Sequence, residues 1–581
     1  MATGVQIYFE VFDETAAQEA SFSCASVQGW VDYSQLTDGV YPDDENEDPQ
    51  NPALRRYVTG ETGAVTLDGS CRLFPDSPGP NMGYWSAAMS GADGSFSTPP
   101  VLVCSFGDTA HESVGLTIHF DVSAHLSDFT VEWRGASGAV LASQSVTGNA
   151  ASTVFVEQHV EDYTEVRITC EKTDAPWRYV KIQEIEFGQR MTYHEGNLVS
   201  ASLTEEADLS GASVPAGSLQ LEVVDPEGRL NPVNPQGIYT YLRRGMALHV
   251  AFLRDGARYP GGLYYLDAWE GTDAATAKLT AVDAVGLKAS LPYSSAFYRS
   301  GTAASVILAD IFTRCALDGS VASGVGSGTY TGYIPDCTMQ EALAHACVAC
   351  GGYVRSGRDG SVDILPPPSA ADSPLVIGQG AVLGEPKATK SQEVGQITVE
   401  EYSYTVSSTQ DLYETPRIWL GPDPQYYRYA FDGVYTGMTS WIQSEIGSGS
   451  ASQEDIRYEY HSVEFYAWES ADYGPMYVEI QGFSVGESRV LRSLSPGAAG
   501  DGVELTGIPL ITRGNLTAVS QRMQDYYSRS LQIKLRTPWT PGLECGARVT
   551  VPTRFGNVTG NVTRLDIDLT GGLLAAMEVL A

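Results

Sequence analysis

The 581-residue chain is poor in basic residues. Lys and Arg number 35 against 71 Asp and Glu, only seven of the 35 are Lys, and the formal net charge is −36. Proteins hold nucleic acid through contacts from Lys and Arg to phosphate, so this balance predicts a chain that does not grip DNA or RNA. A strongly acidic composition also promotes solubility, and composition alone favours that explanation.

Cysteine and long apolar runs are also scarce. The nine Cys are scattered and odd in number, which predicts reduced thiols rather than a disulfide framework. No run approaches the roughly 20 apolar residues of a membrane-spanning helix. The opening residues, MATGVQIYFEVFDETAAQEA, have no basic region followed by a long apolar one, so we expect no signal peptide.

Several stretches contain the residues of a chemical site without its spacing. In HACVACGG, His345 and Cys347 would lie roughly 200° apart on a helix and could not share a metal ion with Cys350. GFSVG at residues 482–486 fits a nucleophile elbow, but that motif needs a downstream His and the last His is His461. The acidic run YPDDENEDPQ lacks the D-x-D-x-D-G ladder of a calcium loop, which favours a solvated loop.

No motif therefore predicts an enzyme, a cofactor or a metal site. No Lys follows a Gly, so a phosphate-binding loop is absent. With 71 carboxylates, a glycosidase pair can be neither assigned nor excluded from spacing. We expect a non-catalytic protein that carries no cofactor and no metal.

The chain is rich, instead, in residues typical of turns and strands. It has 60 Gly, 30 Pro, 32 Tyr and 43% apolar residues, which predicts a folded, mainly β protein with a few short helices. Its length allows about three to five domains. The predicted segments are 1–83, β-rich; 84–190, a β-sandwich; 191–300, a first barrel segment; 301–390, a helix–hairpin segment; 391–514, a β-rich insertion loaded with Tyr and acids; and 515–581, a C-terminal barrel segment.

Residues 84–190 have the pattern of a self-contained β-sandwich. Apolar residues alternate with small or polar ones from Val114 to Phe120, and short strands are separated by tight turns, as in VEWRGASGAVLAS. Aromatic faces suit pyranose rings, although aromatics in strands are more often core, as we expect for Trp133. Trp85, in the loop MGYWSAAMSGADG, is expected to be the most exposed ring. The sugar-binding candidates are Trp85, Trp177 and Tyr179.

The segment SLQLEVVDPEGRLNPVNPQGIYTYLRRGMALHVAF predicts a strand, a turn locked by prolines, a helical turn and a second strand. Leu219, Leu221 and Val223 alternate with polar residues, as in a strand with one buried side. IYTYLRR is expected to form one or two helical turns that end at Gly245. A short meander rolled into a small barrel would accommodate this layout.

Helices are predicted in three further places. One has an apolar stripe from Ala304 to Cys315, and a second opens with Thr338 and Glu341, spaced as a capping box, and stops at Gly351. A third follows residue 515 and leads into strands that run to the C-terminus. We expect these strands to complete the barrel that begins near residue 192, which makes the middle of the chain an insertion.

Several of these stretches together resemble a known family. Three stretches are similar to the tail-tip or baseplate hub proteins of phages and prophages of Gram-positive bacteria. They are GRLNP…NPQGIYTYLRRGMALHV, YPGGLYYLDAWE and MQEALAHACVACGGYVRSGRDGSVDILP. RMQDYYSRSLQIKLRTPWTPGLECGARVTV resembles the last ring-domain segment of that family, and RYVTGETGAVTLDGSCRLFPDSPGPNMGYWS resembles its N-terminal regions. APWRYVKIQEIEFG resembles the closing strand of discoidin-like (factor 5/8 type C) carbohydrate-binding modules.

The resemblance implies a fold, partners and a location. Hubs of this family form homotrimers in which each subunit contributes two tail-tube-like β-barrels, so that a ring continues the tail tube. They join the distal tail ring protein to fibre or spike proteins, contact the tape measure protein, and open to let DNA pass. The chain would then be made in the host bacterial cytoplasm and reside at the distal tail tip of the virion.

Two other functions remain open from the sequence. The sandwich could make the protein an adhesin that binds a host cell-surface glycan, with the remaining domains as scaffold. A tail-associated cell-wall hydrolase is the second alternative, although the chain shows no catalytic motif. For the hub, three copies would carry 3 × −36 = −108 formal charges, and we expect part of this charge to line a lumen that DNA crosses without binding.

Overall fold

The computed structural model describes most of the chain as two compact units. The described residues are 3–29, 31–38, 59–61, 82–121, 124–234, 237–272, 275–369, 371–390, 394–444, 451–469, 474–494 and 500–581. The sandwich unit comprises Tyr8–Thr192 and Ile238–Leu242, and the scaffold unit comprises Met1–Ile7, Tyr193–Gly237 and Arg243–Ala581. The acidic run at residues 41–50 lies outside the described residues.

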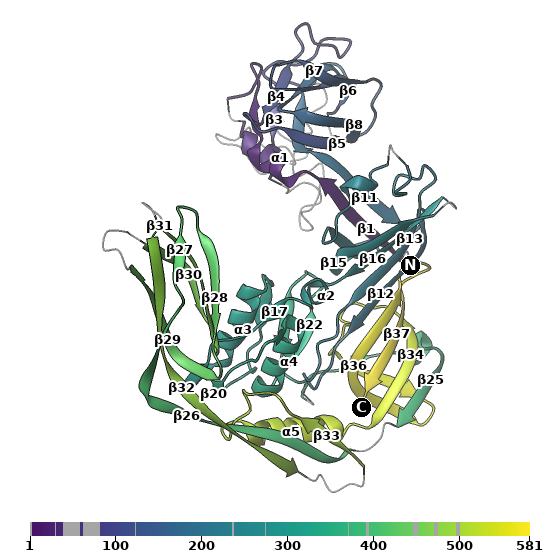
Figure 1. Cartoon of the computed structure of the whole chain (residues 1–581). Coiled ribbons are helices and arrows are strands. Elements are labelled where there is room, and N and C mark those ends of the chain that lie inside the picture. Colours follow the sequence, from purple (N-terminus) through teal and green to yellow (C-terminus); the bar gives the residue numbers. More distant parts are fainter. Residues whose placement is uncertain are drawn as a thin grey trace. The chain divides into compact units, whose positions relative to one another are not determined.

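The sandwich unit consists of a four-stranded and a five-stranded antiparallel sheet (Figure 1). The first has the order β3-β10-β5-β8 and the second β2-β4-β9-β6-β7. Their strands are β2 (Ser21–Ser23), β3 (Tyr84–Trp85), β4 (Val101–Ser105), β5 (His111–Phe120), β6 (Leu126–Arg134), β7 (Val140–Val146), β8 (Thr153–Tyr163), β9 (Glu165–Thr173) and β10 (Lys181–Glu186).

Residues before position 84 contribute to this sandwich. β2 pairs with β4, and Ala16 of helix α1 (Glu14–Glu19) and Leu36 of the 3-10 helix η1 (Tyr33–Leu36) are buried in the same core as Trp133. Asp13 caps α1 by accepting a hydrogen bond from the Ala16 amide at 2.9 Å. The structure thus packs this part of the predicted 1–83 segment into the sandwich.

One large sheet dominates the scaffold unit. Its strands follow the order β14-β15-β16-β13-β12-β36-β37-β34-β25. The alternation predicted for β13 is confirmed, because Leu219, Leu221 and Val223 are buried. The strands are β12 (Leu198–Glu206), β13 (Ser218–Val224), β14 (Ala247–Arg254), β15 (Ala257–Gly271), β16 (Thr276–Val282), β25 (Leu383–Lys390), β34 (Leu531–Pro538), β35 (Arg548–Thr553), β36 (Gly556–Asp568) and β37 (Leu574–Leu580), with β24 (Leu375–Val376) beside β35. β1 (Thr3–Phe12) and β11 (Gly188–His194) cross the boundary between the units.

Segments far apart in the sequence meet in this sheet. β12 pairs with β36, with Leu203 opposite Ile567. The strands predicted to begin a barrel near residue 192 and to complete it after residue 515 therefore share one sheet. The fold class is confirmed as mainly β and multidomain, with short helices and an N-terminal sandwich.

The segment IYTYLRR is less helical than predicted. Only Tyr239–Tyr241 form a 3-10 helix, η2, which ends at Leu242. Gly245 has a φ of +92°, but its amide donates to the carbonyl of Leu266 at 2.7 Å rather than to a helical carbonyl. The chain thus enters the β14 hairpin before a second helical turn can form.

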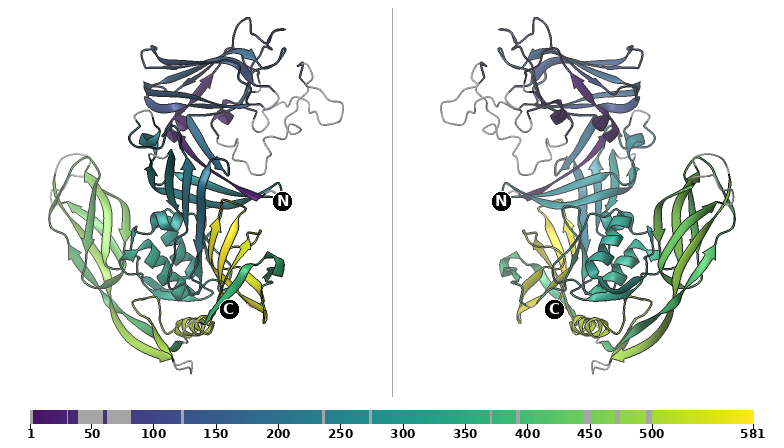
Figure 2. Two further views of the ribbon diagram at one scale, coloured as in Figure 1. Left: turned by 90° about the vertical axis from the view of Figure 1, so that its right-hand side faces the viewer. Right: turned by 90° about the vertical axis from the view of Figure 1, so that its left-hand side faces the viewer.

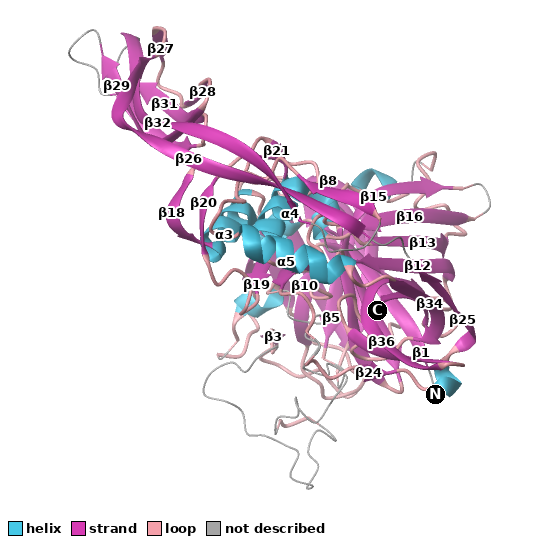
Figure 3. Cartoon of the chain, turned by 90° about the horizontal axis from the view of Figure 1, so that it is seen from below, coloured by secondary structure: helices cyan, strands magenta, loops and turns pink. Residues whose placement is uncertain are grey.

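A helical module follows β16. Helices α3 (Ala304–Arg314), α4 (Met339–Cys350) and α5 (Leu516–Tyr527) lie together (Figure 3). Their buried side chains belong to one apolar core. The predicted capping box of α4 is present, and the helix ends at Gly351 with a φ of +88°. The other elements are α2 (Ala284–Lys288), β17 (Pro292–Tyr293), β18 (Tyr298–Ala303), β19 (Gly319–Val321), β20 (Thr329–Gly332), β21 (Cys337–Thr338), β22 (Tyr353–Ser356), β23 (Val362–Leu365) and η3 (Gln379–Ala381). None of the described helices is long and apolar enough to cross a membrane.

The insertion is built on a ribbon of two long strands, which are part of a five-stranded sheet with the order β27-β32-β26-β33 and with β29 also paired to β32. β26 (Val394–Glu414) and β32 (Gly474–Leu494) pair antiparallel from Ile397 opposite Leu494 to Glu414 opposite Glu479 (Figure 2). A three-stranded sheet, β28-β31-β30, packs with this ribbon around a core that includes Phe465. The remaining strands are β27 (Ile418–Leu420), β28 (Gln425–Ala430), β29 (Val434–Ser444), β30 (Ala451–Tyr458), β31 (Ser462–Glu469) and β33 (Asp501–Leu505).

Candidate functional site

Trp85, the candidate ring expected to be the most exposed, is buried. It lies in β3 opposite Lys181 of β10, and only 3% of its surface is exposed. Its indole N–H donates to the carbonyl of Met82 at 3.1 Å, and the side-chain oxygen of Gln35 accepts the amides of Met82 and Gly83. These contacts draw the stretch into the sheet, so the expectation of an exposed Trp85 is wrong.

A buried ion pair covers the ring of Trp85. The Lys181 Nζ lies 4.4 Å from the ring centroid and 2.9 Å from Oε2 of Glu61. The other Glu61 oxygen accepts the amide of Tyr179 at 2.9 Å, and Thr59 donates to Oε2 at 2.7 Å. An ammonium group over an aromatic face is attracted by the ring quadrupole. Trp85 is therefore covered by the protein's own cation on one face and, with only 3% of its surface exposed, presents no face to a sugar.

Tyr179 belongs to the same cluster, whereas Trp177 does not. The rings of Trp85 and Tyr179 have centroids 6.3 Å apart, and Tyr179 is partly buried. Trp177, two residues earlier, is 47% exposed. The structure thus brings two of the three candidates together as packing residues and presents the third to solvent.

Backbone contacts on both sides hold the loop that carries Trp177. The Trp177 amide donates to the carbonyl of Gly91 at 3.4 Å, and the next amide, of Arg178, donates to the hydroxyl of Ser90 at 3.1 Å. Ser90 in turn donates its amide to the Arg178 carbonyl at 2.8 Å. Trp177 itself has a φ of +57°, a conformation that costs a non-glycine residue roughly 1–3 kcal/mol. The fold thus fixes an exposed indole in a strained backbone conformation.

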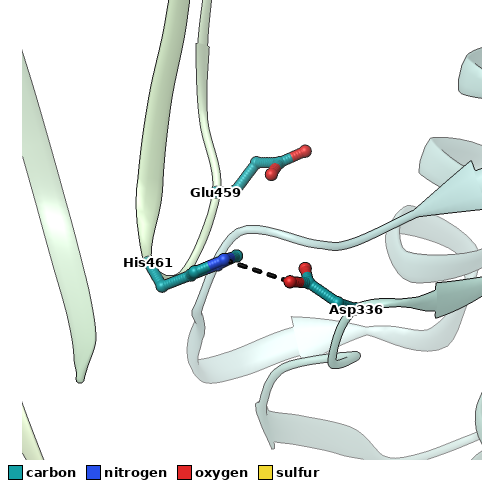
Figure 4. A group of neighbouring side chains, drawn as sticks. All are labelled: Asp336, Glu459 and His461. Carbon is teal, nitrogen blue, oxygen red and sulfur yellow. Dashed lines mark ion pairs between the residues drawn. The ribbon is translucent and has the colours of Figure 1, made fainter. Parts of the chain in front are cut away.

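A second group of polar side chains lies where the insertion meets the helical module. Asp336, Glu459 and His461 converge with their ligand atoms within 4.8 Å of one another (Figure 4). His461 Nε2 is 3.2 Å from Oδ2 of Asp336. Imidazole and carboxylates are the ligand types that divalent transition metals take in proteins, so these three side chains have the composition of a metal site.

The contacts of Glu459 favour an ionic contact between the insertion and the helical module over a metal site. We call this contact region the joint. Its Oε1 pairs with Nη2 of Arg314 at 2.5 Å, and its Oε2 accepts the Ser462 hydroxyl at 2.9 Å. Arg428 approaches Oε2 at 3.5 Å. Two guanidinium groups beside the carboxylate oppose a bound cation by like-charge repulsion. The residues present do not fit a metal ion, and they fit an ionic contact that ties β31 to α3.

The electrostatics of this joint are set by Glu459. Burial by itself would raise the pKa of Glu459, but hydrogen bonds from Ser294, Arg314 and Ser462 outweigh burial and hold the pKa below its ordinary value. The carboxylate is therefore charged near neutral pH and balances Arg314, whose guanidinium also lies 4.7 Å from the ring centroid of Tyr293.

Aromatic contacts complete the joint. Tyr460 stacks on Tyr333 with ring centroids 4.2 Å apart and an interplanar angle of 24°. The amide of Tyr460 donates to the carbonyl of Ser295 at 2.8 Å. Phe297 contacts Tyr404 of β26 edge to face, with ring centroids 5.1 Å apart. The insertion is thus fastened to the helical module by packing as well as by charge.

Sequence reasoning could not find either cluster. Glu61 reaches Lys181, and Arg314 reaches Glu459, across more than a hundred residues, and no local spacing marks such partners. The signal that was present is compositional, namely a segment from 391 to 514 rich in Tyr and acids, which is where Glu459, Tyr460 and Tyr404 lie.

Comparisons with known proteins place the chain beside two kinds of solved structure. No protein-family model and no curated protein sequence matches it. The 43 kDa tail protein of prophage MuSo2 from Shewanella oneidensis is similar with a TM-score of 0.37 and 11% identity, over 67% of this chain and 94% of that chain. The tail protein from Neisseria meningitidis MC58 has a TM-score of 0.38 and 9% identity, also over 67% and 94%. The family 32 carbohydrate-binding module of C. perfringens NanJ, solved with galactose, has a TM-score of 0.19 and 13% identity, over 32% and 99%.

Proposed function

We propose that this chain is a structural hub of a phage tail tip or baseplate. In this proposal three copies form a ring that continues the tail tube at the distal end of the virion. The ring joins the distal tail ring protein and the tape measure protein to fibre or spike proteins, and it lets DNA pass. Its mechanism is assembly and channel opening, not catalytic turnover.

The observation that carries the proposal is the pairing of β12 with β36. The segments that resemble the hub family, 218–252 and 522–551, lie far apart in the sequence and on either side of this pair in the same sheet: the first contributes β13, next to β12, and the second contributes β34, next to β37. A ring subunit needs such a stiff sheet with short turns, because rigid elements lose less conformational entropy on assembly.

The edge of this sheet supports assembly with other copies. β25 forms the end of the strand order next to β34, and seven of its eight residues are exposed. An exposed edge strand presents unpaired backbone groups to which another chain can add a strand. In a ring, a neighbouring copy is the natural partner for this edge.

The charge of the chain fits a conduit for DNA. A net charge of −36 per copy repels the phosphate backbone, so DNA would move through a lumen lined by part of this charge without being held. A basic lumen in the assembled particle would contradict this part of the proposal.

The sandwich supports a second role in binding host-surface glycan. The supporting observation is Trp177, an exposed indole held by backbone hydrogen bonds in a strained conformation. Indole faces stack on the apolar faces of sugar rings while neighbouring polar groups select hydroxyls. In this role the sandwich brings the tail tip to the cell surface before the channel opens.

Particle mass and symmetry test the hub proposal. Light scattering on the purified full chain should give a mass three times 62.3 kDa, and negative-stain images should show a three-fold ring with a central hole. A stable monomer at micromolar concentration, with no ring in the images, would contradict the proposal.

Glycan binding tests the second role separately. The full chain is screened on a glycan array together with Trp177→Ala and the matched control Leu141→Ala, which removes a side chain that is exposed in the same unit. We expect Trp177→Ala to weaken binding at least tenfold and Leu141→Ala to leave it unchanged, because only the indole would contact the sugar. Equal binding by all three proteins would remove Trp177 from the site.

A further inference from the structure

The β28-β31-β30 sheet of the insertion has an inner and an outer face. Along β31, Val463, Phe465 and Ala467 are buried in the core of the insertion, whereas Glu464, Tyr466 and Trp468 point the other way. Residues directly opposite one another in an antiparallel pair lie on the same face. The outer face includes Tyr426, Arg428, Glu454, Arg457, Glu464, Tyr466 and Trp468.

Three aromatic side chains lie together on the outer face. Tyr426 of β28 is directly opposite Tyr466 of β31, and their ring centroids are 5.7 Å apart at an interplanar angle of 59°. Tyr426 is 53% exposed and Tyr466 is 42% exposed. Trp468, partly buried, follows two residues further along β31, roughly 7 Å away by strand geometry.

The fold does not need these rings for its core. The inner face of the same sheet already has its aromatic packing, since Tyr427 and Tyr429 contact Phe465 with centroid distances of 5.9 and 6.0 Å. The rings of Tyr426 and Tyr466 face solvent instead. Single exposed apolar residues are ordinary, but a contiguous group on one face marks an interaction surface.

A row of charged groups runs beside the rings. Glu464 lies between Arg428 and Arg457 in the strand register, with Arg428 Nε 2.9 Å from Oε1 and Arg457 Nη1 3.8 Å from Oε2. The ion pairs hold a carboxylate and two guanidinium groups next to the aromatic pair. Guanidinium groups donate hydrogen bonds and the carboxylate accepts them, so both kinds of partner that a sugar hydroxyl requires are present.

We infer that the outer face of the β28-β31-β30 sheet binds a neutral glycan, with sugar rings stacked on Tyr426, Tyr466 and Trp468. The glycan would be uncharged because the two arginines of the outer face are matched in number by its two carboxylates, Glu454 and Glu464, and because a chain of net charge −36 repels anionic polymers. The hydroxyls would bond to Arg428, Glu464 and Arg457.

A glycan fits these observations better than a protein partner. Interfaces between proteins are also rich in Tyr, Trp and Arg, but their centres are depleted of charged residues. On the outer face the charged row lies directly beside the ring pair and in the same strands. This surface does not involve Trp177 and lies in the scaffold unit, so it is independent of the glycan role proposed for the sandwich.

The inference is tested on the full chain by calorimetric titration with cellohexaose, maltohexaose and chitohexaose. The proteins compared are the wild type, Tyr426→Ala/Tyr466→Ala, Trp177→Ala, and the control Phe555→Ala, which removes a ring that is 86% exposed on another hairpin. We expect at least one neutral oligosaccharide to bind, the double variant to bind it about tenfold or more weakly, and Phe555→Ala to bind unchanged. Thermal melting of each variant shows that the loss does not come from unfolding.

Each outcome of the titrations either supports or overturns glycan binding by the outer face. Binding that survives Trp177→Ala but falls in Tyr426→Ala/Tyr466→Ala supports the outer face, even if the sandwich binds no sugar. Binding that falls only in Trp177→Ala overturns the inference and leaves the sandwich as the glycan site. No binding of the three oligosaccharides to the wild type overturns it as well. A double variant that changes particle mass and leaves glycan binding intact assigns the face to contact between copies instead.

Discussion

Nη2 of Arg314, at the end of α3, lies 2.5 Å from Oε1 of Glu459, in the turn that leads into β31. Both side chains are largely buried, and each has further partners: Arg314 donates to the carbonyl of Ser294, and Glu459 accepts from Ser462. This pair is the ionic part of the joint between the insertion and the helical module. The pair stabilises the attachment of the insertion, because a buried charge without its partner lowers the free energy of unfolding.

Replacing Arg314 by Met should loosen the joint strongly. The change leaves the buried Glu459 carboxylate without its main partner, which destabilises a protein by about 3–5 kcal/mol. Urea titration of Arg314→Met should therefore show a clear loss in the free energy of unfolding. The matched control is Arg244→Met, because Arg244 pairs with Asp267 at the surface and such pairs contribute about 0–1 kcal/mol. Equal losses in the two variants would contradict the role of the joint.

Acid should weaken the same joint. The pKa of Glu459 is below its ordinary value, so its charged form stabilises the folded state at every pH above the unfolded-state pKa of about 4.3. This stabilisation is lost as the pH falls through the lower, folded-state pKa. Stability measured from pH 7 down to pH 3 should therefore decline more in the wild type than in Glu459→Gln, whose side chain does not titrate. Parallel declines would show that other carboxylates dominate.

The two N-termini of α3 and α4 offer a matched pair of capping changes. Thr338 caps α4, with its hydroxyl accepting the Glu341 amide, whereas Ala303 at the start of α3 provides no side-chain cap. Thr338→Ala should cost about 1 kcal/mol of unfolding free energy, and Ala303→Ser should recover a similar amount. Chemical denaturation of both variants measures the effect. A Thr338→Ala variant as stable as the wild type would show that the packing of α4 makes its cap redundant.

The thiols of α4 should resist alkylation in the folded protein. Burial raises the pKa of Cys350 to about 12 and raises that of Cys347 further, so neither is a thiolate at pH 8. Treatment with iodoacetamide followed by mass spectrometry should leave both unmodified under native conditions and modify both in urea. Cys24, which is partly exposed, serves as the internal comparison and should react first. Rapid native labelling of Cys347 would indicate that α4 opens readily.

Features determined by neighbouring residues could be predicted from the sequence. The capping box at Thr338 depends on a spacing of three residues, and the buried side of β13 depends on the alternation of Leu219, Leu221 and Val223. Burial of Ala304 and Cys315 likewise follows from the apolar stripe predicted between them. Each of these structures is set by contacts within one turn of helix or across one strand.

Features that depend on distant partners could not be predicted. Trp85 is buried because Gln35 holds its strand and because Lys181 and Glu61 cover its ring, and none of these residues is near it in a local pattern. The pairing of Arg314 with Glu459 and the placing of Tyr426 opposite Tyr466 arise in the same way, from the return of a long insertion. The Tyr-rich composition of that insertion indicated where to look but not which rings remain exposed.

The ribbon of β26 and β32 gives the insertion a modular character. Ile397 and Leu494 are opposite one another in the ladder, so the chain enters and leaves the insertion through two adjacent strands. The segment between them could be exchanged without breaking the large sheet of the scaffold unit, because the strands of that sheet lie outside residues 397–494. Such an exchange would give up the contacts that Glu459 and Tyr460 make with the helical module. Related chains could therefore acquire new surface specificities by grafting at this ladder position while the core sheet is inherited unchanged.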